Sequence, residues 1–378
     1  MNQEATAYCA LNRIFGYNPA LALSLLNSCG SPQDLFRAAP DIPGHQDLSD
    51  QLNQASLDWA ARELETMDRL GFRFLHLGQE DYPSPLSECE DPPLGIYIRA
   101  SSAPAEIFSL RPMVAIVGTR DVSPYGSTWC KKIVEAMAEA AVKPCIVSGL
   151  AFGIDGIAHT AALEHGLTTI GVMATGIETV YPWQHKELAR RMSEAPGCAV
   201  LTDYPMNTAP VALNFVRRNR IIAGLSSSVT VIESRKRGGA LMTARYACDY
   251  SRDVFAVPGR IDDVRSAGCN SLISAHMAEI VASPEELVEK LGLMPRSRRK
   301  TDRRKVLRSA IVSRYGSTAD AMETVCLCIF DSPGIGFAEI SAITSLPYST
   351  VLECAGMLEA DGFIVTDLLQ RCCISGRY

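Results

Sequence analysis

Residues 113–124 read MVAIVGTRDVSP and join five apolar residues to a glycine-containing turn and a serine–proline pair. A short, continuous apolar run of this kind predicts a strand that is buried on both faces. Ser123 and Pro124 are favoured at a helix N-cap and first turn, so we expect an amphipathic helix to follow, as far as about residue 141. The stretch therefore predicts one strand–turn–helix unit of an α/β fold.

The same alternation of strand and helix continues to about residue 291. Apolar runs of strand length recur at 145–147, 168–173, 199–202, 229–232 and 254–257. Strands that alternate this regularly with helices predict a doubly wound, mostly parallel sheet. Such sheets bind ligands in the crevice at the carboxyl ends of their strands, which is where the turns GTR, SGLAFGID and GIETVYP fall.

The two ends of the chain lack this alternation. The first 72 residues read as helices, among them 18–30 and 52–70, and hold no group that we expect to be catalytic. Residues 321–378 predict three helices followed by a small hairpin, which is typical of a winged helix-turn-helix. That fold binds nucleic acid more often than protein, and it is used for both.

A strongly basic run separates the α/β core from the C-terminal region. Residues 295–310 contain eight basic residues and one acidic residue: Arg296, Arg298, Arg299, Lys300, Arg303, Arg304, Lys305 and Arg308 against Asp302. Like charges at this density predict a solvated linker, either a spacer or an arm that contacts nucleic acid. The predicted domains are a helical domain at 1–72, an α/β core at 73–293, the basic linker at 294–312 and a winged-helix domain at 313–378.

Composition and charge restrict the class of protein. The 378-residue chain is 47% hydrophobic with a net charge of −6, so we expect a globular protein in which any DNA site is a local basic patch. Its 13 cysteines include no CxxC pair, which favours free thiols in a reducing cytosol over disulfides or a zinc site. The chain shows neither a signal peptide nor an apolar run of the ~20 residues that a membrane span needs, so we predict a cytoplasmic protein without membrane contact.

Residues 214–226 read NFVRRNRIIAGLS and place three arginines and an asparagine directly before an apolar stretch. If a helix begins at these arginines, their charge opposes the helix macrodipole. An anion bound there would offset that cost, because arginines and free helix N–H groups together bind phosphate. The run therefore predicts a phosphate site, and the alternative is a buried helix with a solvated basic end.

Enzyme signatures are missing from the strand-to-helix turns. The chain contains no GxGxxG, P-loop or GxSxG motif, and we predict no catalytic residue and no cofactor. Asp155 and His159 lie four residues apart, but without a third ligand we interpret them as a helix cap and a packed imidazole, not as a metal site. Gly238 and Gly239 precede another predicted helix, where glycine either presents N–H groups to an anion or allows close helix–sheet packing.

Seven segments, in this order, resemble the DprA/Smf family of DNA-processing proteins: VAIVGTR, SGLAFGIDGIAHTAAL, GIETVYP, NFVRRNRIIAGLS, GGALMTARYA, DVFAVPG and GCNSLI. The resemblance covers roughly residues 75–292, and the flanks resemble a SAM-like helical domain and a winged helix. It implies a Rossmann-like core that binds single-stranded DNA of any sequence without cutting it. It also implies a homodimer that loads RecA recombinase onto that strand during natural transformation.

The resemblance implies a DNA site made of three turns. Its residues are Gly118, Thr119 and Arg120; Ser148, Gly149, Ala151 and Gly153; and Phe215, Arg218, Asn219 and Arg220. To these we add Arg217 from the same basic run, and Gly238, Gly239 and Thr243 from the glycine turn and the helix after it. Arginines and turn N–H groups suit phosphates, and Phe215 suits stacking on a base of any identity. The chain departs from the family pattern at Val216, which replaces a proline, and at 238–240, where GGA replaces SGS.

Two other functions fit the predicted sheet. Rossmann-like phosphoribohydrolases carry PGGxGTxxE, but here Leu241 replaces the third glycine and Arg245 stands where the acid is required. Without that carboxylate a glycosidic bond has no evident general acid or base, so we predict that the chain is not an enzyme. The other alternative is a regulatory module with a mononucleotide in the cleft and duplex DNA on the winged helix.

Overall fold

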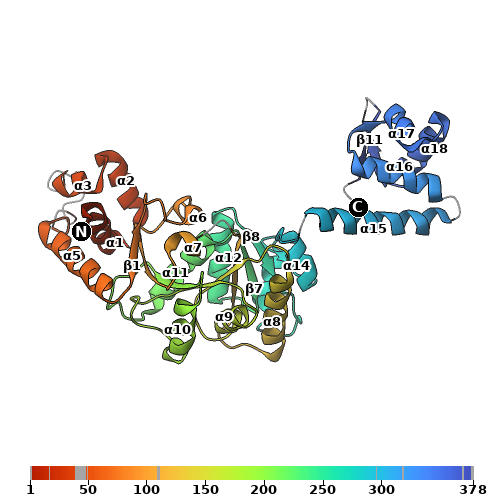
Figure 1. The fold of residues 1–378 in the computed structure, drawn as a ribbon. Coiled ribbons are helices and arrows are strands. Elements are labelled where there is room, and N and C mark those ends of the chain that lie inside the picture. The colour runs from red at the N-terminus through yellow and green to blue at the C-terminus, as the bar shows by residue number, and fades with distance from the viewer. Residues whose placement is uncertain are drawn as a thin grey trace. The chain divides into compact units, whose positions relative to one another are not determined.

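The computed structural model describes residues 2–16, 18–38, 48, 50–108, 111–294, 296–316, 319–367 and 370–375. The chain forms two compact units, Met1–Leu293 and Met294–Tyr378, and Figure 1 shows the elements of each.

The elements of the first unit are α1 (Gln3–Phe15), α2 (Pro19–Cys29), α3 (Pro32–Ala38), α5 (Gln54–Arg69), β1 (Arg73–His76), α6 (Ser84–Ser87), β2 (Gly95–Arg99), α7 (Pro104–Ile107), β3 (Met113–Gly118), α8 (Pro124–Glu139), β4 (Cys145–Ser148), α9 (Ile154–Glu164), β5 (Thr169–Val172), the 3-10 helix η2 (Trp183–His185), α10 (Lys186–Glu194), β6 (Ala199–Thr202), α11 (Ala212–Leu225), β7 (Ser228–Ile232), α12 (Gly239–Asp249), β8 (Asp253–Ala256), α13 (Ala267–Ser274), β9 (Glu279–Ile280) and α14 (Pro284–Lys290). The predicted strands and the helix after Pro124 are all present.

One sheet organises this unit. Its strand order is β1-β2-β6-β5-β4-β3-β7-β8-β9 among the described residues. The strands from β6 to β9 are parallel, and β1 and β2 add an antiparallel edge. Helices α8, α9 and α10 cover one face, and α11 and α12 cover the other (Figure 1). The predicted doubly wound, mostly parallel sheet is confirmed.

Strand β3 is the first strand of the parallel part and lies at its centre, between β4 and β7. The later strands β4, β5 and β6 extend the sheet on one side, while β7, β8 and β9 extend it on the other. The strand order therefore reverses between β3 and β7, and a crevice opens at the carboxyl ends of strands where such a reversal occurs. The register pairs Gly118 with Ile232, so both strands end at the same level.

The helices at the N-terminus share their core with the sheet. Cys9 and Met67 pack in one hydrophobic cluster with Tyr97, Met173 and other residues of the α/β layer. This shared cluster explains why residues 1–293 form a single compact unit. The division at residue 72 stays a prediction.

Helix α11 corrects the prediction for the basic run at 217–220. The helix begins at Ala212, after the extended residue Val211, so these residues lie in its second and third turns. Ala212 and Leu213 are good helix formers and extend the helix toward Pro210. The arginines therefore do not oppose the macrodipole at the helix start, and they have no access to free N–H groups there.

The second unit has its own core. Its elements are α15 (Arg296–Tyr315), α16 (Ala319–Asp331), β10 (Ile335–Gly336), α17 (Phe337–Thr344), α18 (Tyr348–Ala360), β11 (Ile364–Thr366) and β12 (Arg371–Ile374). The strands form a three-stranded antiparallel sheet where two strands were expected. Assignment of this unit to the winged helix-turn-helix class stays a prediction.

Within the predicted solvated linker at 294–312, residues 296–312 instead belong to helix α15. Leu307 and Ile311 are buried in the core of the second unit, so the later part of this segment packs. Two arginines of the basic run, Arg304 and Arg308, and the later Arg314 pair with acidic side chains of the same unit. Nitrogen–oxygen distances are 3.0 Å for Arg304–Asp331, 2.8 Å for Arg308–Glu323 and 2.7 Å for Arg314–Asp361.

Within the described ranges, no helix combines the length and the apolar character needed to cross a bilayer. All 13 cysteines are free.

Candidate nucleic-acid interface

A cleft of about 770 Å³ opens at the carboxyl ends of β3 and β7. The turn after β3, the start of α9, the first half of α11 and the start of α12 form its walls. Its lining residues are Val117, Gly118, Thr119, Arg120, Asp121, Ala151, Asp155, Tyr181, Pro210, Ala212, Phe215, Val216, Arg218, Asn219, Ile222, Ser234, Arg235, Arg237, Gly238, Gly239, Ala240 and Thr243. The cleft lies where the sheet topology predicts a ligand site.

Ten of the predicted site residues line this cleft: Gly118, Thr119, Arg120, Ala151, Phe215, Arg218, Asn219, Gly238, Gly239 and Thr243. Five others do not line it: Ser148, Gly149, Gly153, Arg217 and Arg220. Sequence reasoning did not select Asp121, Tyr181, Ser234, Arg235 or Arg237, which the fold brings to the same cleft. Arg235 and Arg237 lie in the turn that leaves the carboxyl end of β7, so their position after a parallel strand was the signal that could have found them.

Helical geometry decides which residues of the basic run reach the cleft. Phe215, Arg218, Asn219 and Ile222 have the spacing i, i+3, i+4 and i+7, which places them on one face of α11. Arg220 is two positions from Arg218 and therefore points to a different side. From the sequence we predicted that all four residues of the run 217–220 belong to one site. The helix instead brings Arg218 and Asn219 to the cleft and leaves Arg217 and Arg220 outside its lining.

Arg220 is a structural ion-pair residue. Its guanidinium lies 2.8 Å from a carboxylate oxygen of Asp203, and both side chains are almost fully buried, at 7% and 6% exposed. It also donates to the carbonyl of Asp91 at 2.5 Å. These contacts tie α11 to the loop before β2 and leave Arg220 outside the cleft lining.

Arg218 lines the cleft but is itself buried. Its Nη1 donates to the carbonyl of Gly149 at 2.5 Å and to that of Val172. Burial lowers the pKa of this guanidinium to about 10, and the neighbouring carboxylate of Asp155 opposes the shift. Arg218 therefore holds the turn after β4 against α11 while adding positive charge to the base of the cleft.

Arg120 and Phe215 form a contacting pair in the accessible part of the site, which also includes the exposed Arg235 and Arg237. The exposed Arg120 places its guanidinium carbon 4.9 Å from the centroid of the half-buried Phe215 ring. The rings of Phe215 and Tyr181 also meet edge to face, with centroids 5.4 Å apart and an interplanar angle of 62°. A cation over an aromatic face is attracted by the ring quadrupole. This attraction favours the position of the Arg120 guanidinium over the Phe215 ring.

Two glycines allow the turns to approach one another. A Cβ on Gly118 would lie 2.0 Å from the carbonyl oxygen of Ile232, so no other residue fits between β3 and β7. Gly153 has φ of +78°, and a Cβ there would lie 2.2 Å from the carbonyl oxygen of Thr119. Gly153 thus supports the turn that carries Arg120 without touching the cleft itself.

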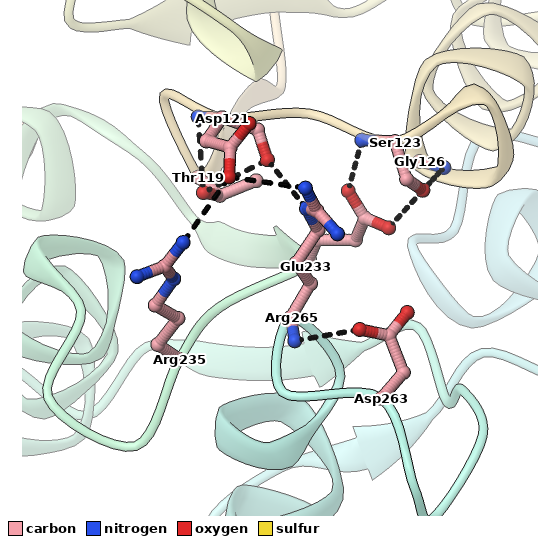
Figure 2. A network of polar contacts seen from close by, with 8 residues as sticks. All are labelled: Thr119, Asp121, Ser123, Gly126, Glu233, Arg235, Asp263 and Arg265. Carbon is pink, nitrogen blue, oxygen red and sulfur yellow. Dashed lines mark hydrogen bonds and ion pairs between the residues drawn. The ribbon is translucent and has the colours of Figure 1, made fainter.

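Asp121 holds two arginines at the mouth of the cleft (Figure 2). One of its carboxylate oxygens lies 3.1 Å from Arg235 and 3.1 Å from Arg265. Arg265 also donates to the Asp121 carbonyl, and the Asp121 N–H donates to the hydroxyl of Thr119 at 3.2 Å. The buried Glu233 accepts from the N–H of Ser123 at 2.9 Å, which fixes the far end of the same turn.

Asp155 and His159 do not form a metal site. The imidazole Nδ1 lies 2.7 Å from the hydroxyl oxygen of Thr169, which itself donates to a backbone carbonyl, so Nδ1 carries the proton. Burial lowers the pKa of His159 to about 3. Asp155 accepts from the N–H of Ala151 at 3.4 Å, and burial raises its pKa. Within the described residues, no group of three or more histidines, cysteines and carboxylates is arranged to hold a metal.

Helix α12 points its N-terminus at the cleft. Its N-cap residue Gly238 and first residue Gly239 both line the wall, and a Cβ on Gly239 would meet no atom within 4 Å. Asn219 fixes this wall by donating to the Gly239 carbonyl at 3.2 Å. The first N–H groups of a helix lack intrahelical partners and favour anions, so this end of the cleft suits a phosphate.

A mostly parallel, doubly wound α/β sheet with a cleft at its switch point defines a Rossmann-like protein, and in this chain arginines and an aromatic ring line that cleft. A family model described as DNA recombination-mediator protein A matches residues 73–292. The chain belongs to that family, which confirms the resemblance to DprA/Smf proteins.

Individual relatives show the same relationship. Protein Smf of Synechocystis is 34% identical over 300 residues, which cover 78% of this chain and 74% of that protein. The X-ray structure of DNA processing protein A from Streptococcus pneumoniae is similar with a TM-score of 0.64 at 28% identity, over 76% of this chain and 98% of that one. A DNA processing protein A of Helicobacter pylori, studied for its single-stranded DNA binding mode, matches with a TM-score of 0.52 at 25% identity, over 58% of this chain and 95% of that one.

Proposed function

We propose that this chain binds single-stranded DNA in the cleft at the carboxyl ends of β3 and β7, whatever the base sequence. The observation that carries the proposal is the Phe215 ring beneath Arg120 in a cleft that Arg218, Arg235 and Arg237 also line. Arginine is well suited to phosphate oxygens, and an aromatic ring stacks on any base. A site that combines the two binds a flexible strand without reading its sequence.

The membership of the family supports the wider role. Relatives are named DNA processing proteins, and the family is described as a recombination mediator. We propose on this basis that the chain forms a homodimer in the cytoplasm and loads RecA recombinase onto the bound strand during DNA uptake. Light scattering tests the dimer, and assembly of RecA on DNA coated with a single-strand binding protein tests the loading. A chain that leaves the RecA assembly rate unchanged would contradict the loading role.

We propose further that the chain is not an enzyme. The two carboxylates of the cleft are occupied: Asp121 pairs with Arg235 and Arg265, while Asp155 is buried beside Arg218. Arg245, at the position where a phosphoribohydrolase needs its acid, is exposed and lies outside the cleft lining. Neither carboxylate is placed as a free general base for hydrolysis.

Fluorescence anisotropy with three labelled ligands tests the binding. We expect a single-stranded oligonucleotide to bind more tightly than a duplex of the same length, and a mononucleotide to bind weakly. Affinity for the single strand should fall steeply with salt, because phosphate contacts release counterions. Preference for the mononucleotide, or its hydrolysis by an amount that follows the purified protein and vanishes in Asp155→Asn, would instead favour the phosphoribohydrolase alternative.

A further inference from the structure

Three aromatic rings stand exposed around the rim of the cleft. The exposed fractions are 42% for Phe152, 44% for Tyr181 and 75% for Trp183. They belong to two loops that leave the carboxyl ends of neighbouring strands, β4 and β5. Single exposed apolar side chains are ordinary, but a group of large rings beside a ligand cleft marks a contact surface.

The rim is continuous with the cleft. Tyr181 lines the cleft, and its ring meets Phe215 edge to face at 5.4 Å. Trp183 follows two residues later, at the start of η2. At the other end of η2, the ring of His185 lies 5.2 Å from that of Phe152, again edge to face at 68°. The segment from 181 to 185 therefore leads from the Phe215 ring out of the cleft.

This segment is held in place by the turn after β4. The Nδ1 atom of His185 lies 2.9 Å from the carbonyl oxygen of Leu150. Ala151, next to Leu150, lines the cleft, so the turn that bounds the cleft also anchors η2. Trp183 is thus presented to solvent by a short helix with a fixed position, which reduces the loss of entropy when a ligand covers the ring.

The chemistry of the segment favours bases over phosphates. Residues 173–185 contain no lysine and no arginine, and the first cation after them is the exposed Lys186 at the start of α10. The nearby carboxylate of Glu187 is already paired with Arg190 at 2.6 Å. A contact made by the Trp183 ring therefore adds stacking without itself adding a phosphate contact, whereas the arginines of the cleft add charge.

We propose that Trp183, with Tyr181 and Phe152, forms a second nucleobase site that takes bases of the same strand where it leaves the cleft. The inference rests on the proposed single-stranded DNA binding and extends it to a named surface. Bases of any identity have a flat face, so this site lengthens the bound segment and leaves the binding independent of sequence. Its contribution depends on the length of the strand, because a short oligonucleotide fills the cleft and ends before the rim.

The test compares full-length wild type with Trp183→Ala on labelled oligothymidylates of increasing length. We expect equal affinity for the shortest oligonucleotides that bind, and at least about fivefold weaker binding by the variant once the strand reaches the rim. The dependence on salt should be the same for both proteins, because no charge is removed. Val142→Ala is the matched control. This side chain is 41% exposed and lies just before the amino end of β4, whereas the cleft lies at the carboxyl ends of the strands.

A second readout uses the ring itself. The chain has three tryptophans, at positions 59, 129 and 183. Long oligonucleotides should quench wild-type emission, and Trp183→Phe should remove most of that quenching while retaining most of the affinity, because phenylalanine still stacks. This variant keeps the test valid even if the alanine variant folds poorly.

The outcomes separate the inference from the function on which it rests. If the wild type binds long and short strands but Trp183→Ala binds all lengths equally well, the second site is wrong and the cleft stands. If the variant loses affinity equally at every length, the ring belongs to the cleft and the extension is wrong. If the wild type binds no single strand of any length, both proposals are wrong.

Discussion

The guanidinium carbon of Arg120 lies 4.9 Å from the centroid of the Phe215 ring. Arg120 follows β3 and Phe215 belongs to α11, so the contact joins two walls of the cleft. It places a positive charge and a flat apolar surface next to one another. These are the two groups needed to hold a phosphate and its neighbouring base, and mutations distinguish their contributions.

Arg120→Ala should weaken binding of single-stranded DNA by ~1–3 kcal/mol, because charged hydrogen bonds to phosphate carry such values. The slope of log Kd against log salt concentration should decrease by about 0.7, which corresponds to the loss of one phosphate contact with a single strand. The side chain is exposed, so the melting temperature should stay close to that of the wild type. Anisotropy titrations at three salt concentrations measure both quantities. Arg37→Ala, which removes an exposed arginine outside the cleft lining, is the control and should bind normally.

Arg218→Ala should act mainly on stability. The substitution leaves the buried carbonyls of Gly149 and Val172 without this donor, and an unsatisfied buried group costs ~1–3 kcal/mol. Urea unfolding measures the loss, and binding should be compared at a temperature where the variant is folded. A variant as stable as the wild type would show that these two hydrogen bonds contribute nothing to the fold.

Phe215→Ala should reduce affinity for single-stranded DNA by ~1–3 kcal/mol with an unchanged salt dependence, because stacking involves no net charge. The ring is half-buried and faces the cleft, so we expect a small change in stability compared with the ~3–5 kcal/mol of a core phenylalanine. Thermal melting and anisotropy on the same variant decide the matter. Early melting together with normal binding by the folded fraction would mean that Phe215 is a packing residue only.

Asp121→Asn should strengthen binding. The carboxylate holds Arg235 and Arg265 and carries negative charge at the mouth of the cleft. Its removal frees two arginines for phosphate, and we expect a gain of ~0.5–1 kcal/mol at low salt that shrinks as salt is added. Asp262→Asn removes a carboxylate paired with Arg260 outside the cleft lining and serves as the control. Weaker binding by Asp121→Asn would show that the ion pairs position the turn instead of competing with DNA.

His159 should make the first unit sensitive to acid. Its pKa is lowered from 6.5 to about 3 by burial, with further contributions from His185 and Arg218. The unfolded chain therefore binds a proton between about pH 6.5 and pH 3 that the folded chain does not. The free energy of unfolding is therefore unaffected by this group above pH 6.5. It decreases as the pH falls through this window, by at most ~1.4 kcal/mol per pH unit.

His159→Gln should reduce the dependence of the free energy of unfolding on pH between about pH 6.5 and pH 3. Asp155 and Asp203, whose pKa values burial raises, contribute with the opposite sign, because they gain protons in the folded state. The difference between wild type and variant at each pH, from urea unfolding, isolates the histidine. Parallel profiles for the two proteins would rule out His159 as the source.

The sequence by itself predicted the sheet and the position of the cleft. Continuous apolar runs of strand length such as 113–117, separated by capped amphipathic helices, favour strands buried on both faces, and the structure has a buried strand there. The carboxyl ends of parallel strands lie at one edge, so the turns carrying Arg120 and Ala151 were expected to meet, and both line the cleft. Local periodicity carries this information because strand and helix spacing are properties of the chain itself.

Only the tertiary structure decided the role of each polar residue. Arg218 and Arg220 differ by two positions in one basic run, yet one lines the cleft and the other is buried against Asp203. Helix α15 packs because Leu307 and Ile311 enter the core of its unit, and the acidic partners of Arg304 and Arg314, Asp331 and Asp361, come from later elements of that unit. A charged side chain is stabilised where a partner of opposite charge lies next to it, and the partners of these arginines are distant in the sequence. Their positions depend on how the helices pack, which no local pattern encodes.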